Sequence, residues 1–332
     1  MDKKAQNILR YSFWTLVAGV LVYFCLRAVD WQEFAAALGQ CRWGYVVLAM
    51  VLGALALFLR GARWHMLLRP IDPSVQVITC FNAYNICMAA NLALPRLGEI
   101  IRLGYPVRYS ATGADGKRLL GFDKVLGTAV VERTWDMLIS LGMLGVLLAL
   151  EWDDLSRFLQ ENLGGIQAGT LAWGLVGLMG LAAAGLYLVY RLRNKGLEKV
   201  WDVFQGIWSG LVSFVRMRRP SLFLLYTVLI WALHWLTSAC IVWALQDIDA
   251  FTALTLKDAF MIMVLGSLSS IIPVPGGFGA YHGVVAGALA SIWNIPMGLG
   301  MIYATLNHES QVLMQAILGL GSYIHESFVR KP

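Results

Sequence analysis

Apolar residues occur along this chain in long runs, and the shorter segments between the runs carry most of the charged residues. A helix of about 20 apolar residues is long enough to cross a bilayer. Six runs are of that kind, over residues 11–29, 43–59, 125–150, 168–190, 220–245 and 297–324. The pattern predicts an all-α polytopic integral membrane protein with six full crossings.

Two further apolar regions, residues 75–107 and 258–293, are interrupted partway along by proline and glycine. The interruptions are Leu94-Pro95-Arg96-Leu97-Gly98-Glu99 and Pro273-Val274-Pro275-Gly276-Gly277-Phe278-Gly279. Proline removes a helical hydrogen bond and clashes with the previous turn. Each region is therefore predicted to form two half-helices, as a re-entrant hairpin. An ordinary kinked span is the alternative, since residues 75–94 alone are long enough to cross.

The composition agrees with a membrane protein, because 58% of the 332 residues are hydrophobic and only 14% are charged, with a mean hydropathy of +0.65. A soluble domain carries about 25% charged residues. The five cysteines are scattered without a C-x-x-C pair, so neither a metal site nor a disulfide framework is expected. No cofactor is expected either.

The positions of the charges predict the topology. If both interrupted regions return to the face from which they entered, 21 of the 26 lysines and arginines lie in segments on one side. The positive-inside rule then places both termini in the cytoplasm, with the first hairpin entering from the cytoplasm and the second from outside. The net charge of +6 marks the cytoplasmic face of an inner membrane protein and gives no reason to expect a nucleic acid partner.

Oppositely oriented broken-helix hairpins at corresponding places are typical of inverted-repeat transporters, which bind substrate near the middle of the membrane. We expect a single membrane domain over residues 1–332. Its first half is 1–150 and its second half is 220–332, while residues 151–219 supply a connecting span and an amphipathic helix on the cytoplasmic leaflet. The halves share no strong residue-level repeat, so this inference rests on topology.

Ionisable residues at membrane depth are the main candidates for a site, because each costs several kcal/mol in hydrocarbon unless it is paired or hydrated. Six of them lie beside the first break and in the next span: Arg96, Glu99, Arg102, Glu132, Arg133 and Asp136. Their charges sum to zero, and Glu132 and Asp136 share one helical face, so we expect a compensated network that binds substrate. A buried ion network with a structural role is the alternative.

The breaks also predict what the site binds. Half-helices that begin after Pro95 and at Gly276 direct free backbone N–H groups toward the membrane middle. With Arg96 and Arg102 nearby, the expected ligand is an anion such as a lipid phosphate. Glycines let a ligand approach the backbone closely, although close helix packing explains them equally well. The glycines in question are Gly276, Gly277 and Gly279.

Later polar residues extend the predicted site. His282 follows the second break, and His308 with Glu309 lies deep in the last span. The His308–Glu309 pair is a candidate for a proton relay or for a simple hydrogen-bonded pair. Other polar residues in the hairpin arms are expected chiefly to cap exposed backbone carbonyls. These are Asn82, Asn85, Asn91, Ser267, Ser269 and Ser270.

Three motifs together resemble those of a known family. They are Asn91-Leu92-Ala93-Leu94-Pro95-Arg96-Leu97-Gly98-Glu99 with Arg102, Glu132-Arg133 with Asp136, and Pro275-Gly276-Gly277-Phe278-Gly279. In order and spacing they are similar to signatures of the lysylphosphatidylglycerol synthase transmembrane-region family, often called flippase-like, over most of the chain. Relatives commonly carry a glutamate a few residues after the last motif, where this chain has His282.

The resemblance implies lipid transport. In the best-known members the membrane unit moves aminoacylated phosphatidylglycerol between leaflets, and a soluble aminoacyl-transferase domain is fused behind it. Since this chain stops at Pro332, the resemblance implies the translocating unit of a bacterial inner membrane without the synthase domain. Membrane lipids that are anionic or carry phosphate are then the expected partners.

Two other functions stay open. An intramembrane enzyme acting on lipid phosphates would use Glu132 or Asp136 as base and His282 or His308 as acid. No D-x-x-D-G, G-x-S-G or H-E-x-x-H motif supports it, so we do not expect an enzyme. An accessory subunit would bind a partner enzyme of envelope lipid synthesis.

Overall fold

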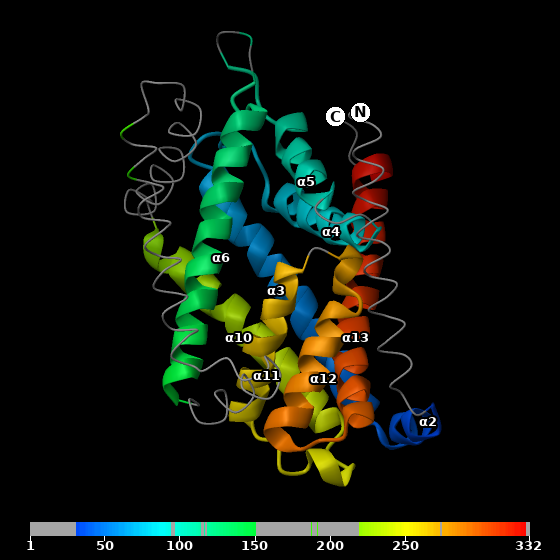
Figure 1. Ribbon diagram of the computed structural model, residues 1–332. Helices are drawn as coiled ribbons and strands as arrows, with labels where there is room; N and C mark the ends of the chain where they lie inside the picture. Colours follow the sequence, from blue (N-terminus) through cyan, green and yellow to red (C-terminus); the bar gives the residue numbers. More distant parts are fainter. Residues whose placement is uncertain are drawn as a thin grey trace, which may run out of the picture. The chain divides into compact units, whose positions relative to one another are not determined.

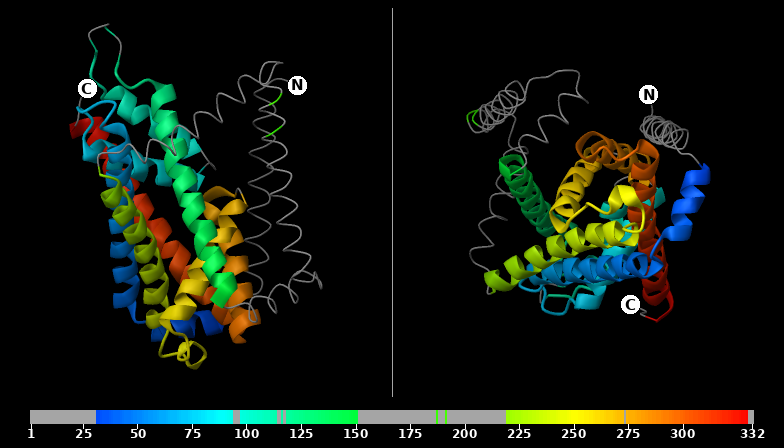
Figure 2. Two further views of the ribbon diagram at one scale, coloured as in Figure 1. Left: turned by 90° about the vertical axis from the view of Figure 1, so that its left-hand side faces the viewer. Right: turned by 90° about the horizontal axis from the view of Figure 1, so that it is seen from below.

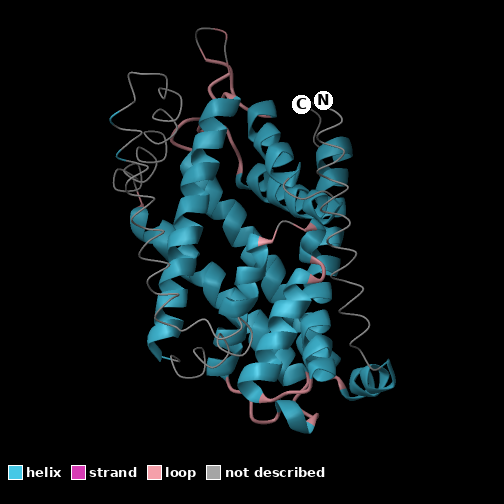
Figure 3. Ribbon diagram, in the orientation of Figure 1, coloured by secondary structure: helices cyan, strands magenta, loops and turns pink. Residues whose placement is uncertain are grey.

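The computed structural model describes residues 31–93, 97–113, 116, 118–150, 187, 191, 219–272 and 274–329. This part of the chain is helical, and its only β-structure is an isolated bridge between Thr112 and Arg118 (Figure 3). The all-α fold class is confirmed for it. The predicted spans 11–29 and 168–190 and almost all of the connecting segment 151–219 lie outside the described residues.

The chain divides into two compact units, Met1–Val125 with Ser221–Pro332, and Leu126–Pro220. The long helices are α2 (Trp31–Gln40), α3 (Trp43–Leu68), α4 (Val77–Ala93), α5 (Leu97–Arg108), α6 (Phe122–Leu150), α10 (Pro220–Ala244), α11 (Leu256–Leu268), α12 (Ala280–Trp293) and α13 (Met297–Ile324). The short ones are η1 (Asp249–Phe251), η2 (Ser269–Ile271), η3 (Pro275–Gly277) and the π-helical η4 (His325–Val329). All but α6 lie in the first unit, which holds both hairpins.

In the first unit α3 and α10 lie side by side, as the view from below in Figure 2 shows. Their ends are joined where the backbone N–H of Arg42 donates to the Ala244 carbonyl oxygen at 2.8 Å. Helix α13 packs on α3 and α4, and α12 packs on α13 and α11. A buried apolar core forms among α10, α11, α12 and α13, around large side chains such as Phe251 and Tyr303. This core fixes the second hairpin against the last helix.

Four predicted crossings are long helices at the expected places. Helices α3 and α10, with 26 and 25 residues, are long and apolar enough to cross a membrane. Helices α6 and α13, with 29 and 28 residues, also have the length of a span, although both carry polar side chains along their course. Helix α13 has the predicted bounds.

Large apolar side chains are exposed in stripes along these helices. Val47, Val51, Leu55 and Phe58 recur every three or four residues on α3, and each is 45–58% exposed. The same spacing recurs on α13 with Leu313, Ile317, Leu320 and Ile324. Soluble monomers rarely expose contiguous apolar surface of this kind. The stripes suit contact with lipid hydrocarbon.

The predicted end of the second span at residue 59 is wrong, because α3 continues to Leu68. The sequence suggests a loop there, since Arg60 and Arg63 follow the apolar run. Arg63 is instead completely buried, and its Nη1 donates to Thr227 Oγ1 on α10 at 3.1 Å. Its guanidinium also lies 5.5 Å from the centre of the Phe223 ring. A buried arginine with such partners is compatible with a continuing helix.

The first interrupted region is a hairpin of α4 and α5, which confirms the predicted break. Helix α4 ends at Ala93 and α5 begins at Leu97. The backbone N–H of Gly98, which has no acceptor within so early a turn of α5, donates to Asn91 Oδ1 at 2.9 Å. The Asn91 side chain therefore caps a backbone N–H group at the start of α5. The sequence pattern predicts that it caps a backbone carbonyl instead.

The second interrupted region is also two packed helices, α11 and α12, joined through η2 and η3. The predicted start of its second helix at Gly276 is wrong, because Gly276 has a positive φ in η3 and α12 begins at Ala280. The predicted serine caps are present at the end of α11. Ser267, Ser269 and Ser270 donate to the carbonyl oxygens of Val264, Gly266 and Ser267 at 2.6, 2.7 and 2.7 Å. Carbonyls left open by the break thus find partners within the chain.

The second break contacts the first hairpin inside the first unit. In Figure 1 the α4–α5 hairpin occupies the upper half of the view and the α11–α12 hairpin the lower half. The turn η3 contacts α4. A Cβ placed on Gly276 would lie 3.5 Å from Leu92 Cδ2, near the end of α4. The turn η3 of the second break therefore lies against α4 close to the helix end that adjoins the first break.

Gly98→Ala is expected to force α4 and α5 apart, because its Cβ would lie 2.0 Å from the Cys87 carbonyl oxygen. We expect a loss of about 1–3 kcal/mol in the free energy of unfolding. Gly104→Ala is the matched control on the same helix, where a Cβ meets nothing within 4 Å. It should leave stability unchanged or raise it by about 0.5–1 kcal/mol. Thermal unfolding in detergent measures both, and equal effects would contradict the close packing.

Asp72 ties the loop after α3 to the end of α5. Its Oδ1 accepts from the backbone N–H and the hydroxyl of Ser74 at 2.9 and 2.6 Å. Its Oδ2 accepts from the Ser110 hydroxyl at 2.6 Å and the Ala111 N–H at 2.9 Å. Burial raises the pKa of this carboxyl, but the hydrogen bonds outweigh burial and hold the pKa below its ordinary value.

Asp72→Asn is expected to cost about 1–3 kcal/mol of stability near neutral pH, because an amide cannot accept at both positions. The folded carboxyl has a lower pKa than the unfolded one, so its stabilisation is present at neutral pH and is lost as the pH falls below about 4. Unfolding of both proteins across this range should show the difference shrinking in acid. A difference that stays constant would contradict the role of the ionised carboxylate.

Candidate functional site

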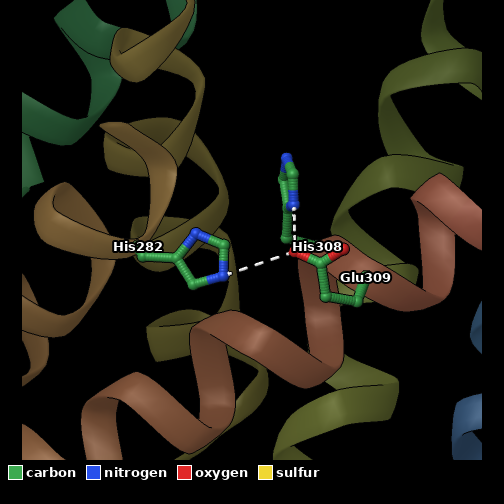
Figure 4. A group of neighbouring side chains, drawn as sticks. All are labelled: His282, His308 and Glu309. Carbon is green, nitrogen blue, oxygen red and sulfur yellow. Dashed lines mark hydrogen bonds and ion pairs between the residues drawn. The ribbon is translucent and has the colours of Figure 1, made fainter. Parts of the chain in front are cut away.

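Three polar side chains converge where the second hairpin meets α13 (Figure 4). Glu309 Oε1 lies 3.0 Å from His308 Nδ1 and 3.5 Å from His282 Nε2. His282 lies in the first turn of α12, while His308 and Glu309 are in the middle of α13. Their ligand atoms all lie within 4.8 Å of one another. The structure thus joins the predicted His308–Glu309 pair with His282 in one cluster.

The His308 ring is held in place on several sides. Its Nε2 lies 2.9 Å from the Gly276 carbonyl oxygen in the turn η3. The Tyr281 ring stacks on it at 5.3 Å between centres, and the Phe278 ring meets it edge-on at 5.3 Å. Tyr281 is itself fixed, since its hydroxyl accepts from Asn307 Nδ2 at 2.6 Å. His308 therefore binds the break of the second hairpin to the last helix.

Exposure differs among the three residues. The side chains of His282 and His308 are 9% and 13% exposed, whereas that of Glu309 is 38% exposed. The carboxylate is the member of the cluster that a molecule from outside meets first. A carboxylate beside two imidazoles can hold a proton, a cation or a cationic headgroup.

The glycines of the second break are explained first by backbone conformation. Gly276, Gly277 and Gly279 have φ angles of 58°, 79° and 78°, a region that residues with a Cβ rarely adopt. A Cβ on Gly276 would also lie 2.7 Å from the Phe278 ring. The turn geometry accounts for these residues, and their predicted contact with a ligand stays a prediction.

Arg102, a predicted ligand for phosphate, is completely buried in the first hairpin. Its guanidinium carbon lies 4.6 Å from the centre of the Trp64 ring and 4.4 Å from that of Tyr84. Nη2 lies 3.3 Å from Glu99 Oε2, one turn earlier on α5. A phosphate could reach this arginine only after α3, α4 and α5 part. Arg102 in this conformation fixes α5 on its neighbours, and Glu99, whose side chain is 33% exposed, is the more accessible of the two.

The other predicted residues of the charged network belong to the second unit or lie outside the described residues. Glu132 and Asp136 are both buried on one face of α6, as their spacing predicts, while Arg133 between them is exposed. From Leu126 onward α6 belongs to the second unit. Arg96 falls outside the described residues. The predicted grouping of these charges with Arg102 therefore stays a prediction.

Sequence reasoning named two asparagines of the first hairpin but missed their partners, Ser322 and Glu326. Asn82 on α4 donates to Glu326 Oε1 in η4 at 2.6 Å, and Asn85 Nδ2 donates to the Ser322 hydroxyl at 2.9 Å. These asparagines bind the side chains of the C-terminal helices, whereas capping of backbone carbonyls was predicted. Their partners lie more than 230 residues further along the chain, so no local signal could have found them.

The sequence matches one family model, described as the lysylphosphatidylglycerol synthase TM region, over residues 13–319. The chain is also similar to Glycosyltransferase AglD of Haloferax volcanii, with 22% identity over 352 aligned positions. That alignment covers 93% of this chain and 54% of the relative, so the chain spans about half the relative's length. No solved structure matches the chain.

Arg102→Ala is expected to lower the free energy of unfolding by about 2 kcal/mol or more, since a desolvated cation–π contact alone reaches about 2 kcal/mol. Arg108→Ala, at an exposed position on the same helix, is the matched control and should change stability by no more than about 0.5 kcal/mol. Thermal unfolding in detergent compares the two. Equal and small effects would show that the aromatic cage does not hold α5.

Proposed function

Since the chain belongs to the lysylphosphatidylglycerol synthase transmembrane-region family, we propose that it translocates a phosphate-bearing lipid between the leaflets of the cytoplasmic membrane. A lipid-related role in a membrane is what the family and the distant relative share. The finer proposal, transport, is supported by the arrangement of the two hairpins.

The observation that carries this proposal is the meeting of the two helix breaks. Non-helical backbone at membrane depth is tolerated only where protein buries it or where it lines a cavity. Transporters place such breaks at the substrate site near the bilayer middle. Here the turn η3 contacts α4, and a cluster of ionisable side chains lies at the same turn. This arrangement suits a headgroup site reached from either face.

The proposed topology has both hairpins re-entrant and both termini cytoplasmic. The hairpin of α4 and α5 enters from the cytoplasm, and that of α11 and α12 enters from outside. The exposed apolar stripes of α3 and α13 then face lipid.

In the proposed mechanism the polar headgroup passes the junction of the breaks while the acyl chains stay in the bilayer. Glu309 is the partly exposed charge at the junction, and it orders a headgroup through hydrogen bonds or through a shared cation. Arg96 and Arg102 supply positive charge for the phosphate when the first hairpin opens. If the cation that His308 and Glu309 share is a proton, the proton relay predicted for this pair would couple the movement to a proton gradient.

A second candidate is suggested by the relative's name. Glycosyltransferase AglD is longer than this chain, and the similarity covers 54% of it. A membrane unit of this family would then work beside an enzyme that builds or modifies lipids. Stable co-purification with such an enzyme, together with no transport by the chain alone, would favour this candidate.

Purified protein in vesicles should move fluorescent phosphatidylglycerol between leaflets faster than protein-free vesicles, as followed by dithionite quenching. Glu309→Gln and His308→Gln should slow movement by about tenfold or more, which corresponds to about 1.4 kcal/mol in the barrier. Asp249→Asn, an exposed carboxylate outside the cluster, is the matched control and should keep the wild-type rate.

Folded Glu309→Gln and His308→Gln proteins that transport at the wild-type rate would remove the cluster from the mechanism. Mass spectrometry of the same vesicles checks the lipids after the assay. Covalent change of the lipid would favour an enzyme over a transporter.

A further inference from the structure

The hydrogen atoms of the His308 ring can be placed from its two contacts. Nε2 lies 2.9 Å from the Gly276 carbonyl oxygen, which can only accept, so Nε2 carries a hydrogen. In a neutral imidazole the other nitrogen, Nδ1, then has a lone pair and no hydrogen. That nitrogen lies 3.0 Å from Glu309 Oε1, which also bears lone pairs when the carboxylate is ionised. Two electron-rich atoms this close require a cation between them.

A second imidazole nitrogen approaches the same carboxylate oxygen. His282 Nε2 lies 3.5 Å from Glu309 Oε1, and it comes from a different helix. The residue is 7% exposed, and its Nδ1 has no hydrogen-bond partner among the described residues. Nε2 is therefore the nitrogen that His282 directs at a charged group.

We propose that His282 Nε2, His308 Nδ1 and a Glu309 carboxylate oxygen form a binding site for one divalent transition-metal ion of the zinc class. Three atoms that can each bind a metal ion come together here from two helices. Bonds of 2.0–2.1 Å to a tetrahedral ion place its ligands about 3.3 Å apart. The separations of 3.0 and 3.5 Å lie on either side of that value, and all three donor atoms lie within 4.8 Å of one another.

The surroundings of His308 support metal binding. Metal-bound histidines usually donate their second ring N–H to a carbonyl or carboxylate, which fixes the tautomer and the ring orientation. The Gly276 carbonyl holds this position for His308, and the rings of Tyr281 and Phe278 restrict its rotation. Little rearrangement is needed for His308 to act as a ligand.

The ligand types select the ion. Two imidazole nitrogens and one carboxylate suit Zn²⁺ and its neighbours, whereas Ca²⁺ and Mg²⁺ prefer all-oxygen ligands. Three protein ligands leave a fourth position for water or another anionic oxygen. With ionised Glu309 the occupied site would carry one net positive charge beside the second helix break. The scattered cysteines predicted no metal site, and His282 and His308, 26 residues apart in the sequence, gave no local signal of one.

Metal binding can be measured without any transport, so the inference stands or falls independently of the proposed function. Full-length protein without a polyhistidine tag is purified in detergent, stripped with chelator and titrated with Co²⁺. We expect one Co²⁺ per chain, with the strong visible absorption of four-coordinate cobalt, and displacement by equimolar Zn²⁺. His282→Ala, His308→Ala and Glu309→Gln should each weaken binding by about 100-fold or abolish it.

His234→Gln is the matched control, because His234 lies on α10 outside the cluster and contacts Arg60. It should bind Co²⁺ like the wild type. Zn²⁺ should also raise the unfolding temperature of the wild type and of the control, but not that of the three cluster variants. Circular dichroism confirms that each variant is folded before titration.

Two results would overturn the proposal. The first is the absence of stoichiometric Co²⁺ or Zn²⁺ binding to the wild type, in which case the cation between His308 and Glu309 is a proton. Nitrogen NMR of the histidine rings would then show both His308 nitrogens protonated. The second is binding that persists unchanged in all three cluster variants, which would place the ion elsewhere.

Discussion

The structure depends on one constraint, which is that backbone groups freed by a helix break must find partners within the protein. The first break finds Asn91, whose side chain accepts from the Gly98 N–H. At the second break Ser269 donates a hydrogen bond to a backbone carbonyl at the end of α11, and the His308 ring binds the Gly276 carbonyl oxygen. Each break is therefore a stable feature of the fold, held by side chains from other turns and other helices.

The same constraint places polar and ionisable side chains at the junction of the hairpins. A side chain that donates a hydrogen bond to an unpaired backbone carbonyl must be polar. The hydrogen bond to the Gly276 carbonyl therefore places His308 where apolar residues would otherwise lie. Glu309 and His282 then complete a cluster whose charges must be balanced. In the first hairpin a charged side chain is stabilised by different contacts, since Arg102 is buried between two aromatic rings and paired with Glu99. A partly exposed polar cluster thus lies where the second hairpin meets α13, and the first hairpin holds a buried positive charge.

Features set by local sequence could be predicted, and those set by distant partners could not. Proline and glycine alone place both breaks, and the apolar run 297–324 gives both ends of α13. The predicted end of α3 was wrong because an arginine after an apolar run, such as Arg63, is typical of a loop. Its partner Thr227 lies 164 residues later in the sequence, so no local pattern could indicate that Arg63 is buried in a helix. His282 and Glu309 were both candidates, but their contact arises only from the packing of α12 on α13.

The central proposal is that the two hairpins enter the membrane from opposite faces, and labelling of single cysteines tests it most directly. In a cysteine-free background, Gln76→Cys and Arg108→Cys mark the two ends of the first hairpin, and Lys257→Cys and Met297→Cys those of the second. All four positions are exposed. An impermeant maleimide should label the first pair only from the cytoplasmic face and the second pair only from outside. Labelling of the two ends of either hairpin from opposite faces would contradict the account.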